Sequence, residues 1–215
     1  MSVCQAVRAP LHAAPAVTIL PRVDLRAGVI AGGYVEGGGD LELDDWIAQA
    51  FEAQAIWRAA GRTQPLSARA PAYLFEAGAA SRLDALLRGA GFAMRAVTIE
   101  IEERTLAYAG AAGMAAVERL RARGWGVGLL CAPDCPLPLG QRARSLFTEI
   151  LAPVPEDLSP ALALADPDAT ALSRRIRAAK AAGLPVTALG VASPAQASLL
   201  LALGFDRGAG PGYRL

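Results

Sequence analysis

Histidine and cysteine are scarce in this chain, and their scarcity excludes several kinds of active site. The 215 residues include one histidine, His12, and three cysteines. A lone histidine near the terminus provides no base for a serine or cysteine nucleophile, so a hydrolase triad is excluded. An odd number of cysteines without an export signal indicates a reducing, cytoplasmic environment rather than a disulfide framework. Cys131 and Cys135 lack a second Cys/His pair, so we interpret them as ordinary cysteines beside a proline-rich loop, not as zinc ligands.

Long apolar runs and a strong net charge are absent as well. Hydrophobic residues make up 53% of the chain, but no stretch approaches the ~18 unbroken apolar residues of a membrane span. The formal net charge of +1 gives no electrostatic reason to expect a nucleic acid or an anionic membrane as partner. Residues 1–16 are interrupted by Arg8, Pro10 and Pro15, so we expect a flexible N-terminal arm rather than a signal peptide, followed by one domain over 17–215.

Short β-type runs alternate with helical segments along the rest of the chain. Runs 17–20 and 28–35 predict a hairpin with its turn around 24–28. Strands are also predicted at 66–69, 97–102, 126–131, 148–151 and 186–190, and helices at 42–61, 80–90, 106–123, 141–147, 168–182 and from 193. This alternation is typical of an α/β protein with a parallel sheet. The length of 215 residues suits a (β/α)8 TIM-like barrel on the short side of the usual ~250.

The clearest strand pattern is that of residues 97–102. Val97, Ile99 and Ile101 alternate with polar residues that include Glu100 and Glu102. In an α/β barrel the apolar face lies under the helices. Glu100 is therefore predicted to point toward the barrel axis near the C-terminal end of its strand, where such folds carry their chemistry.

Four segments in this order resemble the EAL domain family, cyclic di-GMP phosphodiesterases built on a (β/α)8-type barrel whose first strand is antiparallel. VDLRAGVIAG at 23–32 is similar to the segment that leads into the family's Glu-Ala-Leu signature, and IEIEE at 99–103 is similar to its Glu-Ile/Leu-Thr-Glu strand. AGLPVTALGV at 182–191 is similar to the strand ending Ala-Glu-Gly-Val-Glu, and GFDRGAGPGY at 204–213 to the closing Gln-Gly-Tyr. The resemblance covers roughly residues 18–213.

The resemblance implies two Mg²⁺ or Mn²⁺ ions held by oxygen ligands at the strand ends, where they activate a water. Carried over residue by residue, two glutamates of the family remain, as Glu100 and Glu103, although Glu102 replaces the threonine between them. The other positions have changed: the signature glutamate falls at Tyr34, the asparagine near Arg69, the paired aspartates at Leu130 and Cys131, the lysine near Leu151, two glutamates at Leu189 and Ala192, and the last glutamine at Pro211.

This set of replacements predicts that phosphodiester hydrolysis is absent and that no metal cofactor is held. One metal-binding carboxylate remains where the chemistry needs a cluster, and a single carboxylate cannot hold a divalent pair against water. Arg69 adds positive charge at the same place. If the match to the family is shifted by one residue around 128–135, Asp134 falls at a metal-binding position. The glutamate, asparagine and lysine of the family are still not restored. We interpret Glu100 and Arg69 as an internal ion pair that replaces the metals. Because GGGD at 37–40 stands where the family carries a phosphate-binding arginine, we expect weak or no cyclic di-GMP binding.

The sequence therefore favours a catalytically inactive EAL-like domain that acts as a regulatory or protein-interaction module in bacterial cyclic di-GMP-related signalling. It does not name the protein partner, or say whether a second copy of the chain is one. Two alternatives stay open. One is a receptor that holds cyclic di-GMP or another nucleotide without cleaving it. The other, which we disfavour, is an enzyme rebuilt on Glu100, Glu102 and Glu103, because successive residues of one strand cannot all face one pocket.

Overall fold

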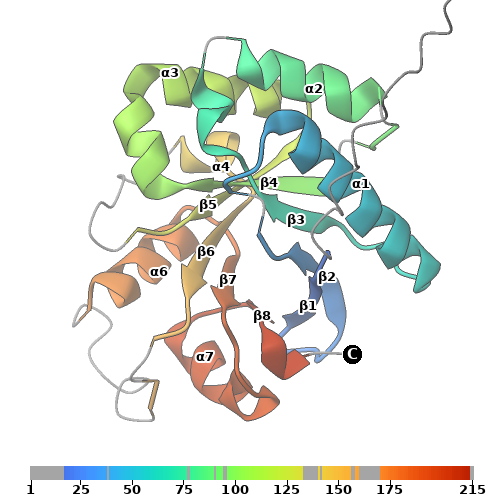
Figure 1. The fold of residues 1–215 in the computed structure, drawn as a ribbon. Coiled ribbons are helices and arrows are strands. Elements are labelled where there is room, and N and C mark those ends of the chain that lie inside the picture. Colours follow the sequence, from blue (N-terminus) through green and yellow to red (C-terminus); the bar gives the residue numbers. More distant parts are fainter. Residues whose placement is uncertain are drawn as a thin grey trace, which may run out of the picture.

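Eight strands close into a barrel in the order of the sequence (Figure 1). The computed structural model describes residues 17–37, 39–76, 78–89, 91–93, 96–132, 140, 142–155, 158–159 and 170–213. The strands are β1 (Ile19–Asp24), β2 (Ile30–Val35), β3 (Leu66–Arg69), β4 (Val97–Glu102), β5 (Gly126–Leu130), β6 (Glu149–Pro153), β7 (Val186–Leu189) and β8 (Arg207–Ala209). β1 is antiparallel to both β2 and β8, and the remaining neighbours are parallel. The predicted barrel with an antiparallel first strand is confirmed.

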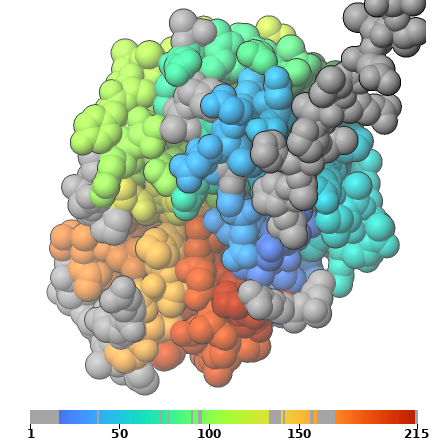
Figure 2. All heavy atoms as spheres, viewed as in Figure 1, coloured from blue at the N-terminus to red at the C-terminus, as the bar shows by residue number. Residues whose placement is uncertain are grey.

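Helices cover the outside of this barrel. They are α1 (Leu43–Ala59), α2 (Ala79–Gly89), α3 (Glu103–Ala122), α4 (Ala143–Leu146), α6 (Ala171–Ala181) and α7 (Ala197–Leu203), with short 3₁₀ turns η1 (Ala72–Phe75), η2 (Pro194–Gln196) and η3 (Pro211–Tyr213). With all atoms drawn, α2 and α3 (green to yellow-green) form the upper part of the visible surface and α7 (red) the lower part (Figure 2). Over the described ranges, none of the helices is long and apolar enough to cross a membrane.

The hydrophobic core lies between the strands and these helices. Leu43, Trp46, Ala50, Ala53 and Trp57 recur at helical spacing on α1 and are all buried. The outward faces of the strands supply the other half of the core, with Val97, Ile99, Ile101, Val127, Leu129, Ile150 and Val186 almost inaccessible to solvent. Each such side chain contributes about 1.5–3 kcal/mol by its burial. This layer fixes the strand register, and the register decides which side chains meet inside the barrel.

The bounds of β1 and α3 differ from those that the sequence predicted, and β8 was not predicted. β1 continues past Leu20 through Pro21 to Asp24, because Pro21 lies opposite Gly33 in an antiparallel pair and the chain turns only after Asp24. The Asp24 carboxylate accepts hydrogen bonds from the backbone N–H groups of Arg26 and Ala27 at 2.9 and 2.8 Å, which closes the predicted turn. α3 begins at Glu103 rather than near Leu106, so Glu103 belongs to a helix start. The three-residue β8 was not predicted as a strand, and the predicted arm over 1–16 lies outside the described residues.

Candidate functional site at the mouth of the barrel

The structure brings Tyr34, Arg69 and Glu100 together on three adjacent strands. Tyr34 pairs with Ser67 in the β2–β3 register, and Arg69 pairs with Glu100 in the β3–β4 register. Burial raises the pKa of the Tyr34 hydroxyl, the negative charge of Glu100 raises it further, and Arg69 lowers it. These three positions, which the resemblance assigns to two metal ligands and an asparagine, therefore face one another inside the barrel.

Glu100 is sealed inside the barrel. Its side chain is fully buried, and in the part of the chain that the structure describes neither carboxyl oxygen has a hydrogen-bond partner. Burial raises the pKa of Glu100 to about 7. The Ser67 hydroxyl, which donates to the Gly33 carbonyl at 3.4 Å, lowers this pKa, and the nearby charge of Glu149 raises it. The retained glutamate is thus neutral in about half of the molecules at pH 7, and the neutral acid is a poor ligand for a cation.

Arg69 pairs with Glu102 and not with Glu100, which corrects the expected internal ion pair. Its guanidinium nitrogen Nη1 lies 3.2 Å from Oε1 of Glu102, and both side chains are partly exposed. Arg69 and Glu102 are the last residues of β3 and β4, so both side chains reach the mouth, whereas Glu100 lies one inward-facing position deeper. The indole N–H of Trp46 donates to the Arg69 carbonyl at 2.6 Å and ties this strand end to α1.

Glu103 points away from Glu100, toward β5 and α6. Its buried carboxylate accepts a hydrogen bond from the backbone N–H of Ala132 at 2.9 Å and forms an ion pair with Arg175 of α6. Cys131 lies beside this pair, and burial raises the pKa of its thiol to about 11. The thiol therefore stays protonated at neutral pH, which makes it a poor nucleophile.

On the other side of the mouth, apolar side chains occupy the positions where the resemblance implies polar ones. Leu130 and Leu151 pair in the β5–β6 register, and Leu189 ends β7. Leu151 is completely buried, and the other two leucines are half-buried. Ala192 and Pro211 are exposed in the segments that follow β7 and β8. The predicted site positions on these strands thus offer no oxygen or nitrogen atom from a side chain.

A buried charge cluster deeper in the barrel escaped the sequence reasoning. Nη1 of Arg22 lies 2.6 Å from Oε1 of Glu149, and both side chains are almost completely buried. The Thr187 hydroxyl donates to Oε2 of Glu149 at 3.1 Å, and Arg207 lies 3.5 Å from the same oxygen. The only signal in the sequence is that Arg22 shares a strand face with Leu20, and this signal does not identify a partner.

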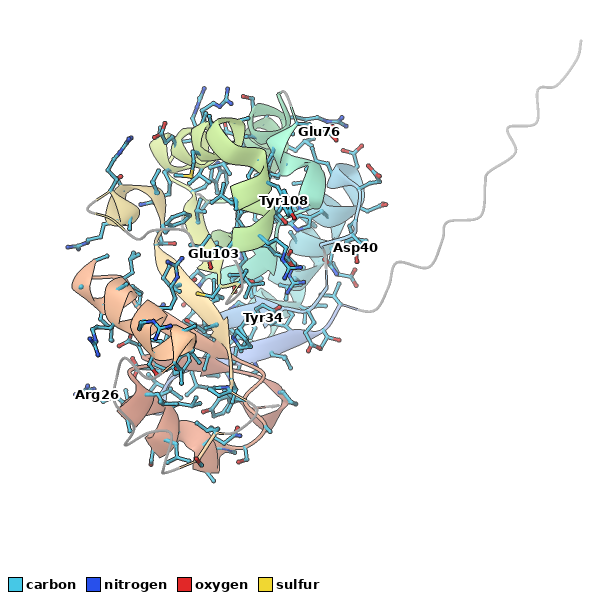
Figure 3. The ribbon with its side chains drawn as sticks, turned by 90° about the vertical axis from the view of Figure 1, so that its left-hand side faces the viewer. Arg26, Tyr34, Asp40, Glu76, Glu103 and Tyr108 are labelled. Atoms are coloured by element: carbon cyan, nitrogen blue, oxygen red, sulfur yellow. The ribbon has the colours of Figure 1, made fainter. Side chains whose placement is uncertain are left out.

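A pocket of about 340 Å³ opens beside the mouth. The loops that follow β2 and β3, the end of β4 and the start of α3 line it, with Asp40, Arg69, Phe75, Glu102 and Thr105 among its residues. Figure 3 shows Tyr34, Asp40 and Glu103 around this region of the molecule. We call it the mouth pocket.

Comparison with known proteins gives a structural answer. No protein-family profile and no curated protein matches the chain. Among solved structures, the PaMucR phosphodiesterase in its cyclic di-GMP complex superposes with a TM-score of 0.74 at 18% identity, over 93% of this chain and 95% of that one. The EAL domain of Mycobacterium smegmatis DcpA superposes with a TM-score of 0.69 at 21% identity, over 90% of this chain and 89% of that one. An EAL domain protein from Listeria monocytogenes EGD-e superposes with a TM-score of 0.63 at 17% identity, over 93% of this chain and 87% of that one. The fold is that of an EAL domain.

The residues present do not fit the two divalent cations that the EAL resemblance implies. Over the described ranges, the structure contains no group of three His, Cys, Asp or Glu side chains that could hold a metal ion. Of the three glutamates at 100–103, one is fully buried with its pKa raised to about 7, and the other two are paired with Arg69 and Arg175. Positive guanidinium groups therefore stand where the cations would need free carboxylates. Asp134 and Cys135 lie outside the described residues.

Proposed function

We propose that this protein is a catalytically inactive EAL-like domain that acts through protein–protein interaction in bacterial cyclic di-GMP-related signalling. The observation that carries the proposal is the pairing of Glu102 with Arg69 and of Glu103 with Arg175. The barrel is retained as a scaffold, since a fold persists after its site has been replaced.

Metal-assisted hydrolysis would require both ion pairs to break. Each glutamate would first have to give up its ion pair with an arginine. The cation would then bind next to that positive guanidinium group, which repels it. Leu151 stands at the lysine position of the resemblance, and its aliphatic side chain can neither carry charge nor move a proton. These two features together support the proposal that the barrel does not hydrolyse cyclic di-GMP.

Turnover is measured directly with purified protein, Mn²⁺ and cyclic di-GMP, and the linear dinucleotide is followed by chromatography. We expect no product above the reaction without protein, while an EAL domain with known phosphodiesterase activity serves as the positive control. Glu100→Ala should leave this baseline unchanged. Product formation that Glu100→Ala abolishes would refute the proposal.

A receptor that binds a nucleotide without cleaving it is the second candidate. It is favoured by the mouth pocket, where the partly exposed Arg69 and the ring of Phe75 could receive a phosphate and a base. It is opposed by Asp40 and Glu102, whose negative charges line the same pocket. We therefore expect no measurable heat when cyclic di-GMP is titrated into the protein in a calorimeter. A micromolar or tighter Kd that Arg69→Ala abolishes would favour the receptor.

A further inference from the structure

Helix α3 presents an uncharged, exposed face that begins one turn after the barrel mouth. Tyr108 has 87% of its side chain exposed, and Gly110, Ala111 and Ala112 beside it are exposed as well. The helix is broken at Gly110, whose φ of 55° and ψ of −129° are not helical. No charged residue occurs between Thr105 and Glu118. Tyr108 lies just before this break and Ala111 and Ala112 just after it; we call these three exposed residues the α3 face.

A single exposed tyrosine needs no explanation, but this one borders the mouth pocket. Thr105 lines that pocket together with Asp40 and Phe75. Tyr108 follows Thr105 by three residues, so the two side chains share one side of α3. In the view of Figure 3, Tyr108 lies lower than Glu76 and higher than Asp40, to the left of both. The side of α3 that carries Tyr108 therefore borders the mouth pocket.

Negative charge is in excess along the edge of the mouth pocket. The mouth pocket is lined by Asp40, Arg69 and Glu102, and a second pocket next to it is lined by Glu42, Asp44, Glu76 and Arg82. Both arginines are already paired, Arg69 with Glu102 at 3.2 Å and Arg82 with Asp44 at 3.3 Å.

Three exposed carboxylates along this edge are not neutralised by a paired arginine or lysine of the described part of the chain. Among the residues that the structure describes, Asp40, Glu42 and Glu76 have no side-chain ion-pair partner. We call these three residues the acidic rim. A local excess of three negative charges is notable in a chain whose net charge is +1.

We propose that the α3 face and the acidic rim together form the docking surface for a protein segment that carries an apolar residue next to arginine or lysine. The apolar residue packs on Tyr108, and the basic side chains pair with Asp40 and Glu76. The inference rests on the proposed function, because it names the partner chemistry of the same interaction module.

Charge complementarity selects this partner over others. The phosphates of a nucleic acid and the head groups of an anionic membrane would meet the acidic rim with like charge, which disfavours both. A tyrosine in the centre of an interface commonly carries much of the binding free energy, whereas charges at the edge set the rate of association and the selectivity. The α3 face would therefore supply most of the affinity and the acidic rim the preference for basic sequences.

The probe is a random peptide library displayed on phage and selected on the immobilised full chain. We expect the selected peptides to be enriched in arginine or lysine beside an apolar residue. One selected peptide is then synthesised with a fluorophore, and its Kd is measured by fluorescence anisotropy. Asp40→Asn/Glu76→Gln and Tyr108→Ala should each weaken binding at least about fivefold. Binding should also weaken as NaCl is raised, because salt screens exposed charges.

Matched controls separate this surface from general effects of charge and hydrophobicity. Glu52→Gln removes an exposed carboxylate of α1 that is not part of the acidic rim, and Val29→Ala trims an exposed residue next to the β1–β2 turn. Neither control should change the Kd, and circular dichroism checks that every variant is folded. Selected peptides without basic enrichment, the failure to select any peptide, or wild-type affinity in either the Tyr108→Ala variant or the Asp40→Asn/Glu76→Gln variant would overturn the proposal. Turnover of cyclic di-GMP would instead refute the proposed function and leave the peptide result unaffected.

Discussion

The carboxyl group of Glu100 has lost its contact with water without gaining a hydrogen-bond partner among the described residues. Burial raises its pKa to about 7, from the 4.5 of an exposed glutamic acid. The folded protein therefore binds this proton more tightly than the unfolded chain does. The contribution of the neutral acid to stability is complete below about pH 4.5 and is lost as the pH rises through about 7.

Glu100→Gln should therefore change stability in a pH-dependent way. At about pH 5 both the wild type and the variant are largely neutral at this position, so their free energies of unfolding should differ by a fixed packing cost. At about pH 8 only the wild type carries a buried charge, and the variant should gain roughly 2–3 kcal/mol relative to it. Urea unfolding at the two pH values measures this change. Exposed Glu52→Gln is the control, and an unchanged difference between wild type and Glu100→Gln across the pH range would contradict the assignment.

At the scale of elements, glycines allow the C-terminal segment to close the barrel. A Cβ atom on Gly210 would lie 2.2 Å from the backbone nitrogen of Val191 and 2.4 Å from its carbonyl oxygen. The same approach lets the Ala209 carbonyl accept hydrogen bonds from Gly190 and Val191 at 2.8 and 3.1 Å. β8 is thus joined to the segment after β7 by backbone contacts that leave no room for a side chain.

Gly210→Ala should destabilise the fold by at least about 2 kcal/mol, because the clash is with backbone that must move rather than with a flexible side chain. Gly89→Ala is the matched control. It lies at the end of α2, where an added Cβ meets nothing within 4 Å, and alanine favours a helix over glycine. Thermal unfolding followed by circular dichroism compares the two variants. Equal melting temperatures would show that the close approach at Gly210 is not needed.

The sequence predicted best those elements in which the hydrophobic periodicity and the length of the segment indicate the same type of secondary structure. The alternation from Val97 to Glu102 placed β4 with its observed bounds and put Glu100 inside the barrel. Three-residue β8, by contrast, consists of Arg207, Gly208 and Ala209, and its identity as a strand depends on pairing with β1 and β7. Such a strand has no periodic signal, because its stability comes from neighbours that are distant in the sequence.

Side-chain partners in the site were less predictable than strand positions. The resemblance placed Arg69 and Glu100 on neighbouring strands, and the register confirms this, but Arg69 reaches Glu102 instead. Two inward-facing residues of one strand differ in depth by about 6.6 Å, and the sequence alone does not say which depth a long arginine side chain prefers. Arg175 was missed for a related reason, since it reaches Glu103 across 72 positions of the chain.

At the scale of the whole molecule, one buried ion pair spans the barrel interior. Arg22 lies on β1 and Glu149 on β6, two strands that are not neighbours in the barrel. The two residues are 127 positions apart, so only the closed barrel brings them to 2.6 Å. Such a pair costs both charges their hydration, and its geometry and extra hydrogen bonds must offset that cost.

Arg22→Met should destabilise the protein by about 3 kcal/mol, because Glu149 would remain buried with only Thr187 and the more distant Arg207. The double variant Arg22→Met/Glu149→Gln should lose less than the sum of its two single variants, by at least about 1 kcal/mol, since the second change removes the uncompensated charge. Urea unfolding at neutral pH measures all members of the cycle. Arg82→Met is the matched control, because its pair with Asp44 is exposed and should contribute less than about 1 kcal/mol. Additive losses in the Arg22 and Glu149 cycle would show that the two groups do not interact across the barrel, and β1 and β6 would then be held in place by backbone pairing and apolar packing alone.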